Sequence, residues 1–152
     1  MKDVTKILIV NGVNLKQLGT REINIYGSVV FEDYLQTLRA RYPEVELSYA
    51  QSDSVDELAA IINQAVDYDG IVLNAGAYTH TSVVLADAVG TIAVPVVEVH
   101  ISNLFGREQY RRNSCLSAVC AGFISGFGLD GYRLAVEAIL EKIKACAIKP
   151  RT

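Results

Sequence analysis

The chain contains no tryptophan, three prolines and three cysteines in 152 residues. Cys115, Cys120 and Cys146 are odd in number and show no CxxC spacing. This pattern argues against a disulfide framework and against a cysteine-based metal site. We therefore expect free thiols in a protein of the reducing cytoplasm.

Long apolar runs and an excess of positive charge are also missing. No apolar run reaches the roughly 18 residues of a membrane span, and Asp3 and Lys6 stand where a signal peptide would be apolar. The net charge of -3 offers no basic surface for nucleic acid. The sequence thus predicts a protein that binds neither membranes nor nucleic acid.

The sequence does contain enough apolar material for a core, with 51% hydrophobic and 20% charged residues. Its length fits a single domain over residues 1–152. The mean hydropathy of +0.25 is high for a small monomer. We interpret the excess as apolar surface buried between subunits, although a tightly packed sheet would also explain it.

Patterns typical of strands and helices alternate along the chain, which predicts a parallel sheet covered by helices on both faces. Ser54-Val-Asp-Glu57 is a capping box that opens the second helix. The pattern fits an α/β, flavodoxin-like, doubly wound five-stranded parallel sheet of order 2-1-3-4-5, whose switch point lies between strands one and three. The expected strands cover residues 6–11, 45–51, 70–74, 94–100 and 118–125. The expected helices cover residues 30–42, the segment after Ser54, 82–89, 104–112 and 131–145.

The loop over residues 12–27 is too long for an ordinary connection, because strand-to-helix loops usually take about two to six residues. It contains neither GxGxxG nor GxxxxGK[ST], so it is not a phosphate loop. Gly12, Gly19 and Gly27 are candidate hinges. We expect this loop to be a lid or a binding loop.

Arg21 and Tyr26 form a suggestive pair within that loop. A tyrosine becomes a base only as phenolate, and lowering its pKa from about 10 to about 7 requires roughly 4 kcal/mol. One guanidinium at contact distance in a water-poor lid supplies much of this. The alternative is that Tyr26 is only a packed side chain and Arg21 is solvated.

The only two histidines, His80 and His100, each follow an apolar run that reads as a buried strand. Ligands of such sheets bind outside the carboxyl ends of the strands. Glu98 lies two residues before His100, so both side chains point to the same face. A carboxylate there fixes the imidazole tautomer and suits a general acid. The alternatives are a structural salt bridge for His100 and a capping or hydrogen-bonding role for His80.

Other polar residues follow the same strands. The amide of Asn74 can hold a substrate hydroxyl or tie its own loop together. Ser102 is a candidate N-cap for a helix over 104–112, and backbone N–H groups at such a start bind carboxylates. Arg111 adds positive charge there, or forms a solvated face. Two histidines and distant cysteines offer no metal spacing.

Several separate segments resemble those of the type II 3-dehydroquinate dehydratase family, in order and over nearly the whole chain. The segments are Asn11-Gly-x-Asn-Leu, Gly19-Thr-Arg-Glu-x-x-Ile-Tyr-Gly27, Gln51-Ser-Asp53, Asn74-Ala-Gly-x-x-Thr-His-Thr-Ser82, Glu98-Val-His-Ile-Ser-Asn103 and Arg107-Glu-x-x-Arg-Arg112.

The resemblance implies a flavodoxin-like subunit that eliminates water from 3-dehydroquinate without metal or organic cofactor. Tyr26 matches the family's base and Arg21 the residue that keeps it ionised. Asn14 matches the asparagine that holds a water against the enolate oxygen. His100 matches the acid that protonates the leaving hydroxyl, with Glu98 as its orienting partner.

The resemblance also implies substrate ligands and an assembly. The matching binding residues are Asn74, His80, Asp87, Ile101, Ser102 and Arg111. Asp87 matches an aspartate that reaches into a neighbouring subunit's site, in a dodecamer built from trimers. Val13 and Lys16 depart from the family's proline and asparagine, which affects the base of the lid and the substrate affinity. The alternative function is a flavodoxin-like module that binds flavin or nucleotide.

Overall fold

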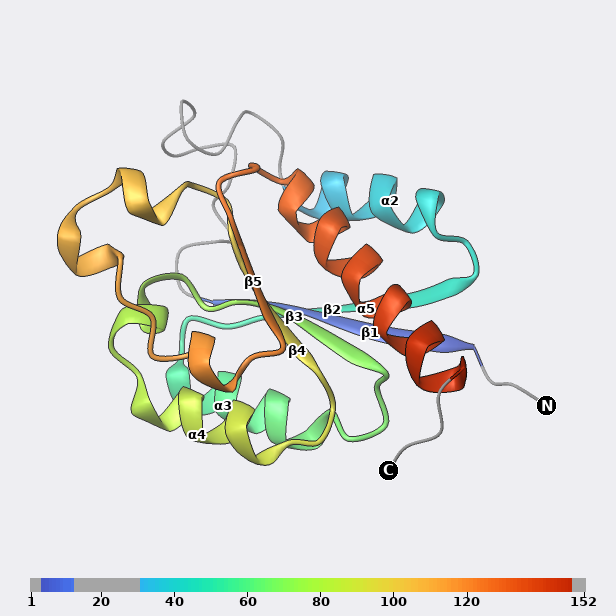
Figure 1. The fold of residues 1–152 in the computed structure, drawn as a ribbon, viewed down its shortest axis with the longest axis horizontal. Coiled ribbons are helices and arrows are strands. Elements are labelled where there is room, and N and C mark those ends of the chain that lie inside the picture. Colours follow the sequence, from blue (N-terminus) through green and yellow to red (C-terminus); the bar gives the residue numbers. More distant parts are fainter. Residues whose placement is uncertain (1–3, 13–30, 149–152) are drawn as a thin grey trace.

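The computed structural model describes residues 4–12 and 31–148 (Figure 1). The loop expected at 12–27 therefore lies outside the described residues, except for Gly12. Asn14, Arg21 and Tyr26 lie outside them as well.

Five parallel strands form one sheet in the order β2-β1-β3-β4-β5, as the alternating pattern predicted. The central strand β3 is buried along its whole length, which agrees with its apolar run Ile71-Val-Leu73. The strands are β1 (Thr5–Asn11), β2 (Val45–Gln51), β3 (Gly70–Asn74), β4 (Val96–His100) and β5 (Gly122–Ser125).

Helices cover both faces of the sheet (Figure 1). The helices α2 (Phe31–Arg41) and α5 (Asp130–Ile148) pack on one face, where Phe31 and Tyr132 belong to the buried core. The helices α3 (Val55–Gln64) and α4 (Val83–Thr91) pack on the other face. None of the helices in the described ranges is both long and apolar enough to cross a membrane.

The capping box predicted at the start of α3 is confirmed in one of its two hydrogen bonds. The Ser54 hydroxyl accepts from the Glu57 backbone N–H at 3.3 Å. The Ser54 backbone N–H donates to the Ser52 hydroxyl at 3.0 Å instead of to the Glu57 side chain. Ser52 thus supplies the second cap.

The helix predicted over 104–112 is wrong. Two short 3-10 turns, Leu104–Gly106 and Gln109–Arg111, occupy this segment. Asn103, not Ser102, caps the first turn, because its side-chain oxygen accepts from the Phe105 N–H at 3.1 Å. The backbone then becomes extended at Arg107, which ends the turn.

Two strands begin later than their sequence patterns suggest. The strand β4 begins at Val96, after Pro95, which has no N–H to contribute to a sheet. The strand β5 begins at Gly122, because residues Ser117–Val119 curl into a 3-10 turn.

Gly12 marks the point where β1 ends against β3. Its N–H donates to the Asn74 carbonyl at 2.7 Å. A Cβ built on Gly12 would lie 2.4 Å from the Ala75 carbonyl oxygen. The close approach of two backbones therefore requires a glycine at position 12.

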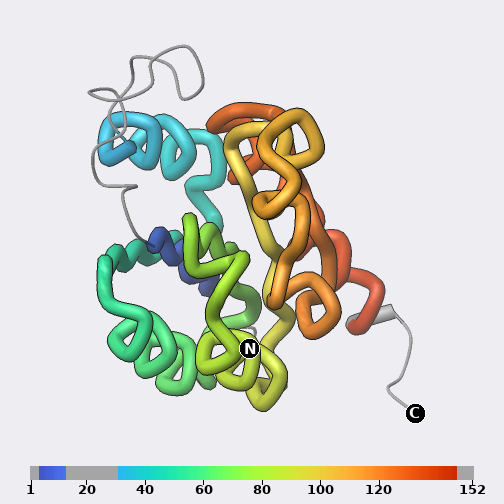
Figure 2. Tube along the Cα trace, turned by 90° about the vertical axis from the view of Figure 1, so that its left-hand side faces the viewer, coloured from blue at the N-terminus to red at the C-terminus, as the bar shows by residue number. Residues whose placement is uncertain are grey.

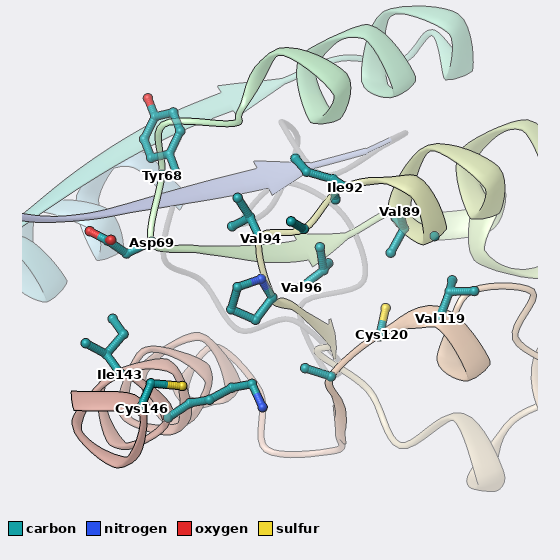
Figure 3. Close-up of a pocket in the computed structure, with 15 residues that line it drawn as sticks. Tyr68, Asp69, Val89, Ile92, Val94, Val96, Val119, Cys120, Ile143 and Cys146 are labelled. Atoms are coloured by element: carbon teal, nitrogen blue, oxygen red, sulfur yellow. The ribbon is translucent and has the colours of Figure 1, made fainter. Parts of the chain in front are cut away.

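An open groove of about 640 Å³ lies at the amino ends of β3, β4 and β5 (Figure 3). Val94, Pro95, Cys120 and Ile143 are among the side chains that line it. None of the candidate site residues within 4–12 and 31–148 lines this groove, since the ones on β3, β4 and the segments after them lie at the opposite ends of the strands.

Candidate active site

His80 and His100 lie close together, as their positions after two neighbouring strands predicted. The ring centroids are 6.5 Å apart and the ring planes are inclined by 22°. His100 ends β4, and His80 ends the 3-10 turn Gly76–His80 that follows β3. Figure 2 looks onto the carboxyl ends of the strands. There the segment after β3 packs beside the segment after β4.

The Glu98 and His100 side chains form a buried pair. The Nε2 of His100 lies 2.5 Å from Oε2 of Glu98. Glu98 is 0% exposed and His100 is 4% exposed. The two-residue spacing on one strand therefore places both groups on the same side, as predicted. With Nε2 on the carboxylate, Nδ1 is the ring nitrogen that can face a substrate.

Two serines complete the surroundings of Glu98. The Ser117 hydroxyl donates to Oε1 at 2.6 Å, and the Ser114 hydroxyl donates to Oε2 at 2.9 Å. Burial by itself raises the pKa of Glu98, but the hydrogen bonds from His100, Ser117 and Ser114 outweigh it and hold the pKa below its usual range. Glu98 is therefore an anion beside His100.

The sequence reasoning missed both serines. They lie 16 and 19 residues after Glu98, in a turn-rich segment without periodicity. The only available signal was the pair of serines shortly after the Arg107–Arg112 motif.

His80 is half-buried, and its ring is fixed by the backbone. Its Nδ1 donates to the Asn113 carbonyl at 2.8 Å, which leaves Nε2 as an acceptor when the ring is neutral. His80 does not cap the following helix. Ser82 does, since its hydroxyl accepts from the Leu85 N–H at 2.9 Å.

Asn74 belongs to a buried hydrogen-bond network at the switch point. Its Nδ2 donates to the Tyr132 hydroxyl at 2.9 Å, and that hydroxyl donates to Oδ1 of Asn11 at 2.7 Å. Oδ1 of Asn74 also accepts from the Gly76 N–H at 3.2 Å. The amide thus ties its own loop together, the alternative that the sequence left open.

The segment after β4 carries the cationic part of the site. The Ser102 hydroxyl accepts from Nη1 of Arg107 at 3.4 Å, and Ile101 is buried beside it. Arg111 pairs with Glu108 at 2.5 Å and is partly exposed. The Glu108 carboxylate raises the pKa of Arg111 further, so this guanidinium stays charged.

Asp87 is exposed on α4, at the surface of the subunit. Within residues 4–12 and 31–148, no three His, Cys, Asp or Glu side chains gather into a group that could hold a metal ion.

A family model described as dehydroquinase class II matches residues 5–140. The 3-dehydroquinate dehydratase of an Exiguobacterium species is 50% identical over 137 residues, which cover 90% of this chain and 94% of that protein. The 3-dehydroquinate dehydratase of Pelodictyon phaeoclathratiforme is 46% identical over 143 residues, which cover 92% of this chain and 95% of that protein.

Solved structures agree with the sequence relatives. The crystal structure of type II dehydroquinase from Butyrivibrio crossotus superposes with a TM-score of 0.87 at 38% identity, over 90% of this chain and 97% of that one. The type II dehydroquinase structure from Propionibacterium acnes gives a TM-score of 0.85 at 37% identity, with the same coverage of the two chains.

Proposed function

This chain belongs to the class II dehydroquinase family, and from that premise we propose that its site converts 3-dehydroquinate to 3-dehydroshikimate in the shikimate pathway. The reaction is an anti elimination of water through an enolate, carried out by a hydro-lyase. The observation that carries the proposal is the buried Glu98–His100 pair at the carboxyl end of β4, beside His80.

The first step removes a proton from C2, next to the ketone. We assign it to Tyr26, with Arg21 keeping the phenol ionised and Asn14 holding a water against the enolate oxygen. These roles follow from the match of the three residues to the family's motifs. The chemistry requires them, because an enolate forms readily only where a base and an oxyanion partner are both in place.

The second step expels the C1 hydroxyl as water, which needs an acid on the opposite face of the ring. His100 takes this role through Nδ1, because Nε2 is held by Glu98. The ionised carboxylate stabilises the protonated imidazole before it donates. The burial of both groups excludes bulk water from the proton transfer.

The substrate is a polyhydroxylated acid, and the polar groups around the histidines suit it. We assign its hydroxyls to Asn74, His80 and Arg111, and its carboxylate to Ile101 and Ser102. The support is the arrangement of these groups around the strand ends, with three guanidinium groups in the segment after β4. Asp87 is assigned to a neighbouring subunit's site, which its exposure on α4 permits.

Three further features belong to the proposal. We infer that residues 1–152 form one catalytic domain with a lid at about 12–27, that the subunits assemble as trimers into a dodecamer, and that the enzyme works in the cytoplasm. The single sheet supports one domain. The exposed phenylalanines near β5 support the assembly. The free thiols of Cys115, Cys120 and Cys146 support the cytoplasmic location.

The direct test adds 3-dehydroquinate to the purified chain and follows the absorbance of the enone product. Tyr26→Phe is expected to fold normally and to lose nearly all turnover. His100→Ala is expected to bind the substrate and eliminate water slowly. Absence of the enone signal with the parent chain would refute the function, whereas full activity of either variant would refute only that residue's role. A flavin or nucleotide module shares the fold, but the family relationship does not favour it.

A further inference from the structure

One short segment, residues 113–117, contacts the surroundings of both histidines. The Asn113 carbonyl accepts from Nδ1 of His80 at 2.8 Å, and the Cys115 N–H donates to the Thr79 carbonyl at 2.8 Å. From the same segment, Ser114 and Ser117 donate to Glu98. The same segment thus holds the His80 ring directly and the His100 ring through Glu98.

The two serines fix the direction of the Glu98 carboxylate. The Ser117 hydroxyl donates to Oε1 of Glu98, whereas the Ser114 hydroxyl and the His100 ring both donate to Oε2. The Ser114 oxygen also accepts from the N–H groups of Leu116 at 3.0 Å and Ser117 at 3.1 Å. Because a hydroxyl has a single hydrogen, these bonds direct the Ser114 hydrogen at the carboxylate.

Within the part of the chain that the structure describes, His100 is the only cation-forming group bonded to Glu98. Cys120 lies near the carboxylate, but burial, with the Glu98 charge adding to it, raises the pKa of this thiol to about 12, so it stays neutral. The buried anion therefore depends on the two hydroxyls for its remaining stabilisation.

We propose that Ser114 and Ser117 are positioning residues for His100. Acting through Glu98, they hold the imidazole with Nε2 on the carboxylate and Nδ1 directed at the substrate. This inference rests on the proposed function and adds to it the groups that orient the acid. Neither serine touches the reacting atoms, so both act on the rate of proton donation and not on substrate binding.

Ser117→Ala is the sharper test, because the Ser117 hydroxyl donates to Glu98 while the Ser114 oxygen also caps the adjoining turn. We expect kcat to fall about tenfold, the scale of one lost hydrogen bond to a charged group, with KM unchanged. Ser117→Thr keeps the hydroxyl and should restore most of the rate. Ser48→Ala removes a half-buried serine on β2 and serves as the matched control.

A second measurement does not depend on turnover. The chain has two histidines, so histidine-selective ¹⁵N labelling gives two sets of imidazole signals that His80→Asn assigns. We expect Ser117→Ala to shift the Nε2–H proton of His100 and to leave His80 in place, and Ser117→Thr to reverse the shift.

The proposal is overturned if Ser117→Ala keeps the parent's kcat and His100 signal. It is also overturned if the variant has a lower thermal stability and a higher KM while the His100 signal stays unchanged, since that outcome indicates a structural role. If the parent chain does not dehydrate 3-dehydroquinate, the proposed function fails by itself. The His100 signal then still decides whether the serines orient the ring.

Discussion

At the scale of single residues, the site depends on buried polar side chains that are nearly all hydrogen-bonded to one another. Glu98 accepts three hydrogen bonds, and Tyr132 bridges two amides. A buried charge or amide that loses a partner costs more than an exposed one, because water cannot replace the bond. Substitutions here should therefore affect stability and activity together.

The low pKa of Glu98 makes stability depend on pH. The unfolded chain binds this proton near the usual pKa of 4.5, and the folded chain binds it only at lower pH. The contribution of Glu98 is thus complete above 4.5 and is lost as the pH falls through the folded pKa. We expect Glu98→Gln to flatten the decline in unfolding free energy as the pH falls below about 5, measured by urea denaturation.

Asp130→Asn is the control for that experiment. Its carboxylate also has a lowered pKa, from a hydrogen bond with Arg133, but it is exposed to solvent. Salt and water weaken such a pair. Parallel stability curves for Glu98→Gln and the parent would show that Glu98 does not contribute the pH dependence.

Tyr132→Phe removes a hydroxyl that serves Asn11 and Asn74 at once. We expect a loss of about 2 kcal/mol in unfolding free energy, because two buried amides each lose a partner. Urea denaturation measures it, and Tyr110→Phe, on a tyrosine that is 67% exposed, should change stability by less than about 0.5 kcal/mol. Equal stabilities for the two variants would contradict the role of the network.

At this scale, the sequence predicted those contacts that depend only on the spacing of two residues along one strand or helix. The Glu98–His100 pair follows from the two-residue period of a strand. The contacts of Ser114, Ser117 and Tyr132 join distant segments, and only the folded backbone brings them together. No local pattern encodes such pairs.

At the scale of elements, apolar periodicity predicted the five strands and the four long helices in the right order. It failed between residues 101 and 121, where the structure has three 3-10 turns. Each turn is too short to show a period and depends on local bonds, such as the Asn103 cap. The polar residues that serve the site in this segment also interrupt the apolar periodicity from which helices and strands are predicted.

The junction of β1 and β3 allows a prediction about the elements themselves. Gly12→Ala places a methyl group against the Ala75 carbonyl, so the two strand ends must separate. We expect a loss of about 2–4 kcal/mol in unfolding free energy. Gly122→Ala, where nothing lies within 4 Å of the added carbon, is the matched control. Unfolding curves that agree for both variants would mean that this crossing tolerates a side chain.

At the scale of the whole molecule, apolar surface remains uncovered around the edge strand β5. Phe105 is 61% exposed and Phe127 is 62% exposed, and Phe123 packs against Phe105. A single subunit leaves these rings in water, which agrees with the high mean hydropathy. The assembly proposed above would bury such surface.

A mixing experiment tests whether neighbouring subunits share a site. His100→Ala and Asp87→Asn are each expected to be nearly inactive alone. In a coexpressed mixture, some sites combine an intact His100 with an intact Asp87 from the neighbour, so about a quarter of parental activity should return. Light scattering checks that both variants assemble. A mixture no more active than the average of its components would contradict a shared site.

The Tyr132 bridge also has a consequence for biosynthesis. Both histidines and Glu98 leave the ribosome before the helix that carries Tyr132. Until α5 docks, Asn11 and Asn74 lack the phenol that joins them, and the part of the sheet face that α2 does not cover stays open. Turnover should therefore begin only after translation of the last helix, so that incomplete chains remain inactive.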